Sequence, residues 1–403
     1  MKLFKDELHD DFGTWPLAYI RYGGPDFGEI AAVAEAVGEG DDSAFHAAWV
    51  ATGDRLAAEA QDVLAKGHRS SARELFLQAS AAYAASYHLL FGAPVDPRLL
   101  SAFRRQIDAF DKGLALGEPP VLPLRIPFEG RSLPAYFIPA AGRADKVRPL
   151  VIQVDGYDAT VTDLYFASAV AASQRGYHCL IFDGPGQGEM LYEHGLPLRP
   201  DWETVVRAVV DFAVSLPTVD PSRIALSGAS LGGYLALRAA TGEPRLAACI
   251  ADPGLWSVAG AARVFASHLG ADLAADASLS TLDQGILDRM FAIIQADRGL
   301  RWKIVQRGFW ANGASDLRDY LRLIEGFTLE GRIEQIQCPV LLTHAENDAL
   351  ASDTQAVFDA LRCAKKIIRF TAAEGAGDHC EMQNRSVLNR RVFDWLDSVI
   401  SLS

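Results

Sequence analysis

The sequence predicts an α/β protein in which a mostly parallel sheet carries helices on both faces and follows a helical segment. From residue 150 onward, short apolar runs of strand-like composition alternate with helical patterns, and this alternation is typical of a parallel sheet. The runs are continuously apolar, which indicates strands buried on both faces. The first 118 residues instead carry apolar residues at helical spacing and contain no convincing strand.

The segment GEPPVLPLRIPFEG, residues 117–130, marks the boundary between these two patterns because proline and glycine interrupt regular structure. We therefore predict an N-terminal helical domain at residues 1–118 and a sheet-containing domain at residues 119–403. Residues 254–335 break the alternation and predict a helical cap insertion between two strands. The strands are expected at residues 122–128, 133–139, 150–154, 177–182, 224–227, 247–251, 340–343 and 366–370.

The composition excludes several classes of protein. Half of the 403 residues are hydrophobic and 22% are charged, enough to build a large core. The formal net charge of −13 and the absence of a long basic run argue against a nucleic-acid partner and an anionic membrane surface. The first residues mix both charge signs, so we expect no secretory signal. Five scattered cysteines without a CxxC pair favour reduced thiols in the cytoplasm, and no metal spacing is present.

The most informative motif is Gly228-x-Ser230-x-Gly232, which lies between a strand-like run and a helical run. A strand that turns sharply into a helix exposes the serine hydroxyl, and small neighbours allow the close chain approach. The amide of Leu231 then points toward the same place and can stabilise an oxyanion. We predict Ser230 as a catalytic nucleophile, against the alternative of a glycine-rich turn with a solvated serine.

A serine nucleophile needs a base, and in this motif the acid and then the histidine follow the serine along the chain. His268, His344 and His379 are the histidines that follow Ser230. His379 lies in a glycine-rich loop between the last predicted strand and the last helix, where it can reach the sheet edge. His344 ends a strand and is expected to pack, and His268 lies in the insertion. We therefore predict His379 as the base.

The acid that orients the histidine should follow a late strand. Asp348 lies in the short loop after the strand at residues 340–343, and it is our prediction. Asp252, after the preceding strand, is the rival, or else forms an Asp-Pro turn. Glu346 is expected to be solvated.

The second oxyanion donor should come from the loop after the strand at residues 150–154. Gly156 allows close approach there, so the amide of Tyr157 or of Asp158 can point at the oxyanion. The Asp158 side chain is expected either to turn away or to contact the substrate.

Aromatic residues of the insertion are candidates for the substrate pocket. Trp256 and Trp310, together with Tyr157, suggest an apolar and possibly aromatic small-molecule substrate. Taken singly, each is also compatible with a place in the core.

The order of Ser230, Asp348 and His379 resembles the α/β-hydrolase superfamily. The wider pattern is similar to the group that contains 2,6-dihydroxypseudooxynicotine hydrolase, fungal polyketide-shortening pigment hydrolases and fermentation-respiration-switch-like esterases. The resemblance rests on the segments SSARELFLQASAAYAASYHLLFG, VDGYDAT, FDGPGQGE, SGASLGGYLALRAA and GAGDHC. It implies an α/β-hydrolase fold, no cofactor, and a homodimer formed through the helical segment.

We therefore expect a serine hydrolase that cleaves a C–C bond next to a carbonyl, by a retro-Claisen route, in a polyketide-like or aromatic β-dicarbonyl. The same three residues also fit a carboxylesterase, thioesterase, lactonase, acyl transferase or cyclase, because an alkoxide or a thiolate leaves more easily than a carbanion. A ligand receptor or scaffold on the same fold is the non-enzymatic alternative.

Overall fold

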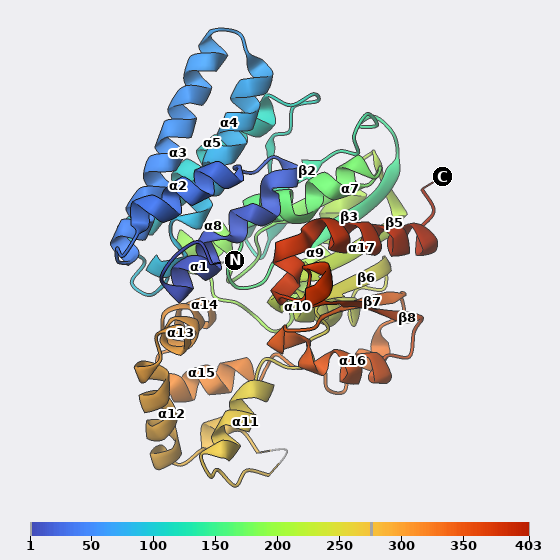
Figure 1. Ribbon diagram of the computed structural model, residues 1–403. Helices are drawn as coiled ribbons and strands as arrows, with labels where there is room; N and C mark the ends of the chain where they lie inside the picture. Colours follow the sequence, from blue (N-terminus) through green and yellow to red (C-terminus); the bar gives the residue numbers. More distant parts are fainter. Residues whose placement is uncertain (1, 275–276, 403) are drawn as a thin grey trace.

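The computed structural model describes residues 2–274 and 277–402, and its centre is one eight-stranded sheet (Figure 1). The strand order is β1-β2-β4-β3-β5-β6-β7-β8. β2 pairs antiparallel with β1 and β4, and all other neighbours are parallel. The mostly parallel sheet expected from the sequence is confirmed. Its strands are β1 (Pro123–Phe128), β2 (Arg131–Ile138), β3 (Arg148–Val154), β4 (His178–Phe182), β5 (Val219–Ala229), β6 (Leu246–Asp252), β7 (Val340–Ala345) and β8 (Lys365–Phe370).

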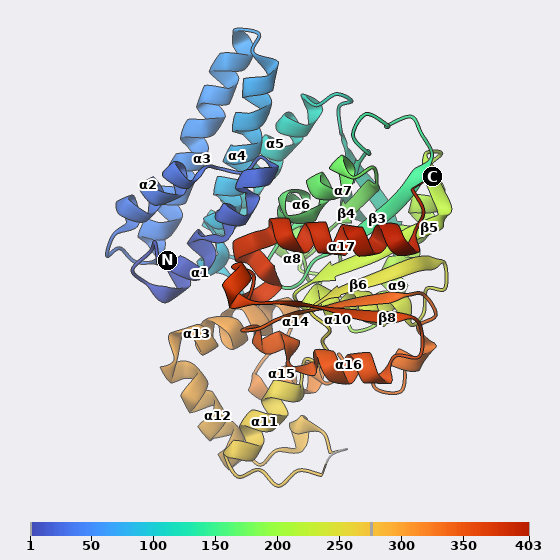
Figure 2. The ribbon, with the colours of Figure 1, turned by 45° about the vertical axis from the view of Figure 1, so that its right-hand side comes forward.

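Helices cover both faces of the sheet, so the central strands are buried on both sides. Because successive side chains of a strand point to opposite faces, Leu150 and Ile152 of β3 pack with α9 (Trp202–Val214) and α10 (Leu231–Ala240). Val151 points the other way and shares its cluster with α17 (Arg385–Val399), which runs along that face (Figure 2). Because the central strands run parallel, their carboxyl ends lie at the same edge of the sheet.

The helical leader comprises the elements before β1, and no strand occurs in its described residues. Its elements are α1 (Glu7–Gly13), η1 (Trp15–Tyr22), α2 (Phe27–Val37), α3 (Asp42–Ala65), α4 (Arg69–Ala85), η2 (His88–Leu90) and α5 (Pro97–Ala115). Its helices form most of an apolar cluster in which Phe45 and Trp49 are fully buried. η1 reaches the sheet side, where the Tyr19 ring stacks on Phe166 at 5.4 Å between centroids.

A helical insertion separates β6 from β7, as the broken alternation predicts. It contains α11 (Gly260–His268), η4 (Leu279–Thr281), α12 (Gln284–Ala296), α13 (Arg298–Leu300), the π-helical η5 (Arg301–Phe309), α14 (Trp310–Asn312), α15 (Leu317–Ile324) and η6 (Ile333–Gln335). Arg298 pairs with Asp6 and Asp42 of the leader. Leader and insertion therefore meet beside the sheet (Figure 1).

The remaining helices connect strands or follow them. They are α6 (Val161–Leu164), η3 (Tyr165–Ala169), α7 (Val170–Gln174), α8 (Gly188–Tyr192), η7 (Ala349–Asp353), α16 (Thr354–Ala360), η8 (Ala372–Glu374) and η9 (His379–Asn384). Among the helices described in residues 2–274 and 277–402, none has the length and apolar character needed to cross a membrane.

Candidate active site

The turn between β5 and α10 holds Ser230 in an unusual backbone conformation, with φ 60° and ψ −129°. A positive φ is costly for a residue with a side chain, so it persists only where the surroundings fix it. Here the Ser230 amide donates to the Asp252 carbonyl at 2.6 Å. The two flanking glycines are required, because a Cβ on Gly228 would lie 1.9 Å from the Gly232 carbonyl oxygen and one on Gly232 would lie 2.6 Å from the Val154 carbonyl oxygen.

Three polar side chains meet at this turn. His379 Nε2 lies 2.9 Å from Ser230 Oγ, and His379 Nδ1 lies 2.8 Å from Asp348 Oδ2. A carboxylate only accepts hydrogen bonds, so Nδ1 carries the proton and Nε2 accepts from the serine hydroxyl. The Asp348 side chain is 4% exposed and follows β7, and His379 begins η9 after β8. This is the arrangement in which an imidazole can take the serine proton.

The electrostatic environment of His379 favours the imidazolium. Burial lowers the pKa of His379, but the hydrogen bond and charge of Asp348, followed by the charges of Asp252 and Asp158, raise it overall above its ordinary value. A positive charge that develops on the ring during proton transfer is therefore stabilised.

The rival residues occupy other places. His268 is exposed at the end of α11 and His344 lies within β7. Glu346 accepts a hydrogen bond from the Ala372 amide. Asp252, the rival acid, accepts from Thr343 Oγ1 at 2.7 Å instead of from a histidine.

The loop after β3 passes directly beside the Ser230 turn. A Cβ on Gly156 would lie 2.9 Å from Ser230 Cβ and 3.1 Å from the Leu231 amide nitrogen. The Leu231 amide belongs to the first position of α10, where helical N–H groups have no intrahelical acceptor. The amides of Tyr157 and Asp158 follow Gly156 in the same loop. The two chain segments expected to form an oxyanion site are therefore in contact.

A cavity of about 70 Å³ opens above Ser230, and the leader contributes to its wall. Trp15 and Tyr19 of η1 line it together with Tyr157 and Asp158 of the β3 loop. The other residues that line it are Asp155, Gly156, Ala159, Asp163, Leu164, Ala167, Ser168, Ala229, Ser230, His379, Cys380, Met382 and Arg385. Most of its exposed wall is apolar, which suits an apolar substrate.

Neither Trp256 nor Trp310 belongs to this wall. The Trp310 ring stacks on Tyr192 at 5.3 Å and lies 5.2 Å from Phe91, within the apolar cluster of the leader. Trp256 packs against the core on the α9 and α10 face of the sheet. Both rings therefore pack in apolar surroundings away from this cavity.

Asp158 takes part in an ion pair that the sequence gave no sign of. Its Oδ2 accepts from Arg307 of the insertion at 2.7 Å, and both side chains are largely buried. The same guanidinium lies 4.6 Å from the centroid of the Tyr157 ring. His88 Nε2 lies 3.1 Å from the Asp158 carbonyl oxygen. The loop after β3 is therefore held by both the insertion and the leader.

Two further carboxyl groups line the cavity. Burial, and then the charge of Asp163, raise the pKa of Asp155 well above its ordinary value. Burial also raises the pKa of Asp163, which accepts from the Tyr19 hydroxyl at 3.1 Å. Burial thus disfavours the charged form of both groups.

Sequence reasoning did not identify Trp15, Tyr19, Arg307 or Arg385 as parts of this region. No motif surrounds them, and their proximity to Ser230 arises from packing between distant segments.

Comparisons with known proteins identify the family of the chain. Residues 155–390 match the alpha/beta hydrolase family. The 20-hydroxy-prefusarin hydrolase of Gibberella moniliformis is 32% identical over 96% of this chain and 95% of that protein. The hydrolase acrC of Aspergillus aculeatus is 31% identical over 94% of each chain.

Among solved structures, that of 2,6-dihydroxy-pseudo-oxynicotine hydrolase has the same fold, with a TM-score of 0.73, 22% identity and 96% coverage of both chains. The family match spans more than half of the chain, and the fungal relatives match nearly its whole length. This chain therefore belongs to the alpha/beta hydrolase family and is a hydrolase.

Proposed function

We propose that the protein is a serine hydrolase in which Ser230 is the nucleophile, His379 the base and Asp348 the acid that orients it. The observation that carries this proposal is the hydrogen-bonded chain from Ser230 Oγ through both nitrogens of His379 to Asp348, with distances of 2.9 and 2.8 Å. The Leu231 and Tyr157 amides are proposed to stabilise the oxyanion, which the contact between the Gly156 loop and the Leu231 amide supports.

The reaction that we propose is hydrolysis of a C–C bond next to a carbonyl in a β-dicarbonyl compound. His379 takes the Ser230 proton while Oγ forms a bond to one ketone carbon. The tetrahedral intermediate collapses, the C–C bond breaks, and its electron pair leaves on an enolate that takes the proton from His379. Water then gives a proton to His379 and attacks the acyl carbon, and Ser230 leaves with that proton.

The substrate class is proposed from the cavity and from the relatives. The apolar wall and the rings of Trp15, Tyr19 and Tyr157 favour an apolar or aromatic small molecule, such as a polyketide-like β-dicarbonyl. Asp158 is proposed to contact the substrate at the edge of this wall. One relative is named for the hydrolysis of 20-hydroxy-prefusarin, which supports a small organic substrate.

The proposal is tested in two steps with the full chain. A fluorophosphonate should label wild-type protein stoichiometrically and should not label Ser230→Ala, because it reacts with activated serines. Turnover of an aryl β-diketone is then compared with turnover of the matching aryl ester. Labelling that persists in Ser230→Ala would reject the nucleophile, and ester cleavage without C–C cleavage would replace the proposed reaction with that of an esterase.

We also propose a cytoplasmic location and a homodimer. All five cysteines are free thiols in the structure, which suits a reducing compartment. Light scattering of the purified chain tests the dimer.

A further inference from the structure

Asp252 lies where the strands that lead to the proposed triad converge. It is the last residue of β6, its side chain is buried, and Ala229 of β5 is its partner in the sheet register. On the other side, the neighbouring residue of β6 pairs with Leu342 of β7. Asp252 therefore stands between the strand that ends at Ser230 and the strand that precedes Asp348.

Three neighbouring segments form hydrogen bonds with Asp252. The Ser230 amide donates to its carbonyl at 2.6 Å, which holds the strained turn. Thr343 Oγ1, on β7, donates to its Oδ1 at 2.7 Å. Arg385, the first residue of α17, donates to its Oδ2 at 3.3 Å. One residue thus contacts the nucleophile turn, the strand before the acid and the helix after the histidine loop.

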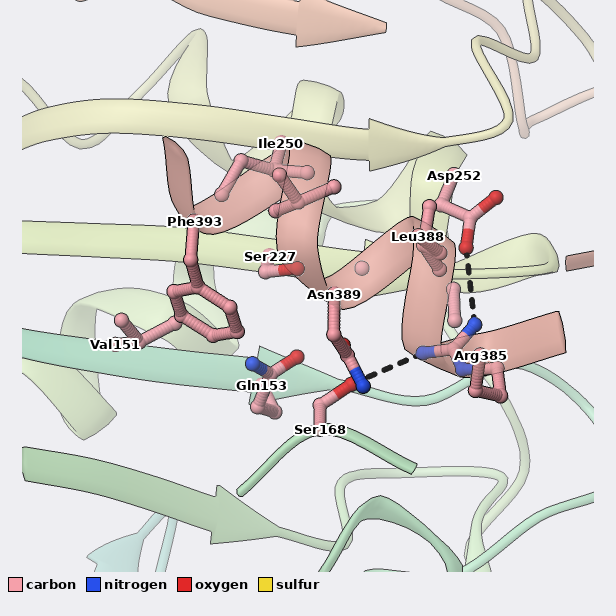
Figure 3. A pocket seen from close by; sticks show the side chains of 13 residues that line it. Val151, Gln153, Ser168, Ser227, Ile250, Asp252, Arg385, Leu388, Asn389 and Phe393 are labelled. Carbon is pink, nitrogen blue, oxygen red and sulfur yellow. Dashed lines mark hydrogen bonds and ion pairs between the residues drawn. The ribbon is translucent and has the colours of Figure 1, made fainter. Parts of the chain in front are cut away.

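Arg385 extends this connection to the histidine loop. Its guanidinium is buried and lies between Asp252 and Ser168, whose Oγ accepts at 3.0 Å (Figure 3). It also donates to the carbonyl of Cys380 at 2.7 Å. Cys380 directly follows His379 and has φ 54°, and Glu381 has φ 48°. Such a backbone persists only where its surroundings fix it, and the Arg385 hydrogen bond does so next to the catalytic imidazole.

We propose that Asp252 and Arg385 are a buried pair of positioning residues that hold the Ser230 turn, the strand before Asp348 and the His379 loop in register with one another. This inference rests on the proposed serine hydrolase function and assigns to Asp252 a role other than that of the triad acid. The pair acts through Ser230 and His379 and takes no proton from the substrate.

A second buried carboxyl group lies beside the pair. Glu381 is fully buried beside it, and burial, followed by the charge of Asp252, raises the pKa of Glu381 well above its ordinary value. Burial thus disfavours the charged form of Glu381 next to Arg385. The charge of Asp252 also helps to raise the pKa of His379. The other titratable or charged groups facing or adjoining His379 are Asp348, Asp158, Asp378, Cys380, Glu381 and Arg385.

The decisive variant is Asp252→Asn, which keeps the shape of the side chain and removes its charge. The readout is the pH dependence of Ser230 labelling by a fluorophosphonate, which requires no known substrate. The plateau rate is expected to fall about tenfold or more because the triad loses its alignment. The midpoint is expected to move to lower pH, by about 0.5 unit or more, because an anion that stabilises the imidazolium is gone.

Two matched variants separate positioning from general damage. Thr343→Val removes one hydrogen bond to Asp252 without changing any charge, so the plateau should fall while the midpoint stays. Glu203→Gln breaks a different buried ion pair, that with Arg238, which joins α9 to α10. It should lower stability and leave both plateau and midpoint unchanged.

A folded Asp252→Asn protein with the wild-type midpoint would overturn the proposal, whatever its plateau, and so would one with the wild-type plateau. If circular dichroism shows that this variant does not fold, Thr343→Val decides, and an unchanged plateau there overturns the proposal. Loss of wild-type labelling in Ser230→Ala establishes the nucleophile separately, so failure of the positioning pair is distinguishable from failure of the proposed function.

Discussion

The guanidinium of Arg307, in the insertion, donates a hydrogen bond of 2.7 Å to the carboxylate of Asp158, in the loop after β3. The two side chains are 18% and 16% exposed, so the pair is largely removed from water. It connects the insertion to the loop proposed to hold the oxyanion. The position of that loop therefore depends on the insertion as well as on the sheet.

Replacing Arg307 by methionine should lower the free energy of unfolding by about 2 kcal/mol, because it leaves the buried Asp158 carboxylate unpaired. Urea denaturation measures this loss. Lys66→Met is the control, since its pair with Asp62 is exposed and should contribute less than about 0.5 kcal/mol. Adding Asp158→Asn to Arg307→Met should recover part of the loss. Equal losses in Arg307→Met and Lys66→Met would show that the buried pair contributes no more to the free energy of unfolding than an exposed pair does.

The rate of Ser230 labelling should rise with pH and reach its midpoint above 6.5, the ordinary value for histidine, because the pKa of His379 is raised. Only the neutral imidazole accepts the serine proton, so activity is lost as pH falls through that pKa. Asp348→Asn removes the largest favourable contribution to the imidazolium, so it should move the midpoint down and lower the plateau by about 10⁴-fold. A midpoint that does not respond to Asp348→Asn would contradict the proposed pairing.

Gly156→Ala should reduce both labelling and ester turnover by about 100-fold, since the new methyl group would lie 3.1 Å from the Leu231 amide and crowd the proposed oxyanion site. A stability loss of about 1–3 kcal/mol should accompany it, because the site is already close-packed. Gly260→Ala is the matched control, because its added Cβ meets nothing within 4 Å. Full activity in Gly156→Ala would remove this loop from the oxyanion site.

Local sequence patterns were sufficient to predict the sheet and the order of the site residues. Strands such as β4 and β6 are continuous apolar runs, and the Gly228-x-Ser230-x-Gly232 spacing follows from a backbone clash that any larger residue would create. The approach of His379 and Asp348 to Ser230 follows in turn, because parallel strands end at one edge.

Contacts between distant segments could not be predicted in the same way. Trp256 and Trp310 were expected to line the cavity together with Tyr157, whereas the rings that join Tyr157 there are those of Trp15 and Tyr19. An aromatic residue indicates burial, but its neighbours depend on how helical segments that are distant in the sequence pack together. The Arg307–Asp158 pair spans 149 residues of chain and leaves no local trace for the same reason.

The η1 segment brings residues near the amino terminus into the wall of the cavity above Ser230, through Trp15 and Tyr19. Part of the wall around Ser230 thus comes from residues far from it in the chain. We expect substitutions at these two positions to change which substrates the protein accepts while leaving the residues proposed for the reaction in place, so directed evolution of selectivity can begin there.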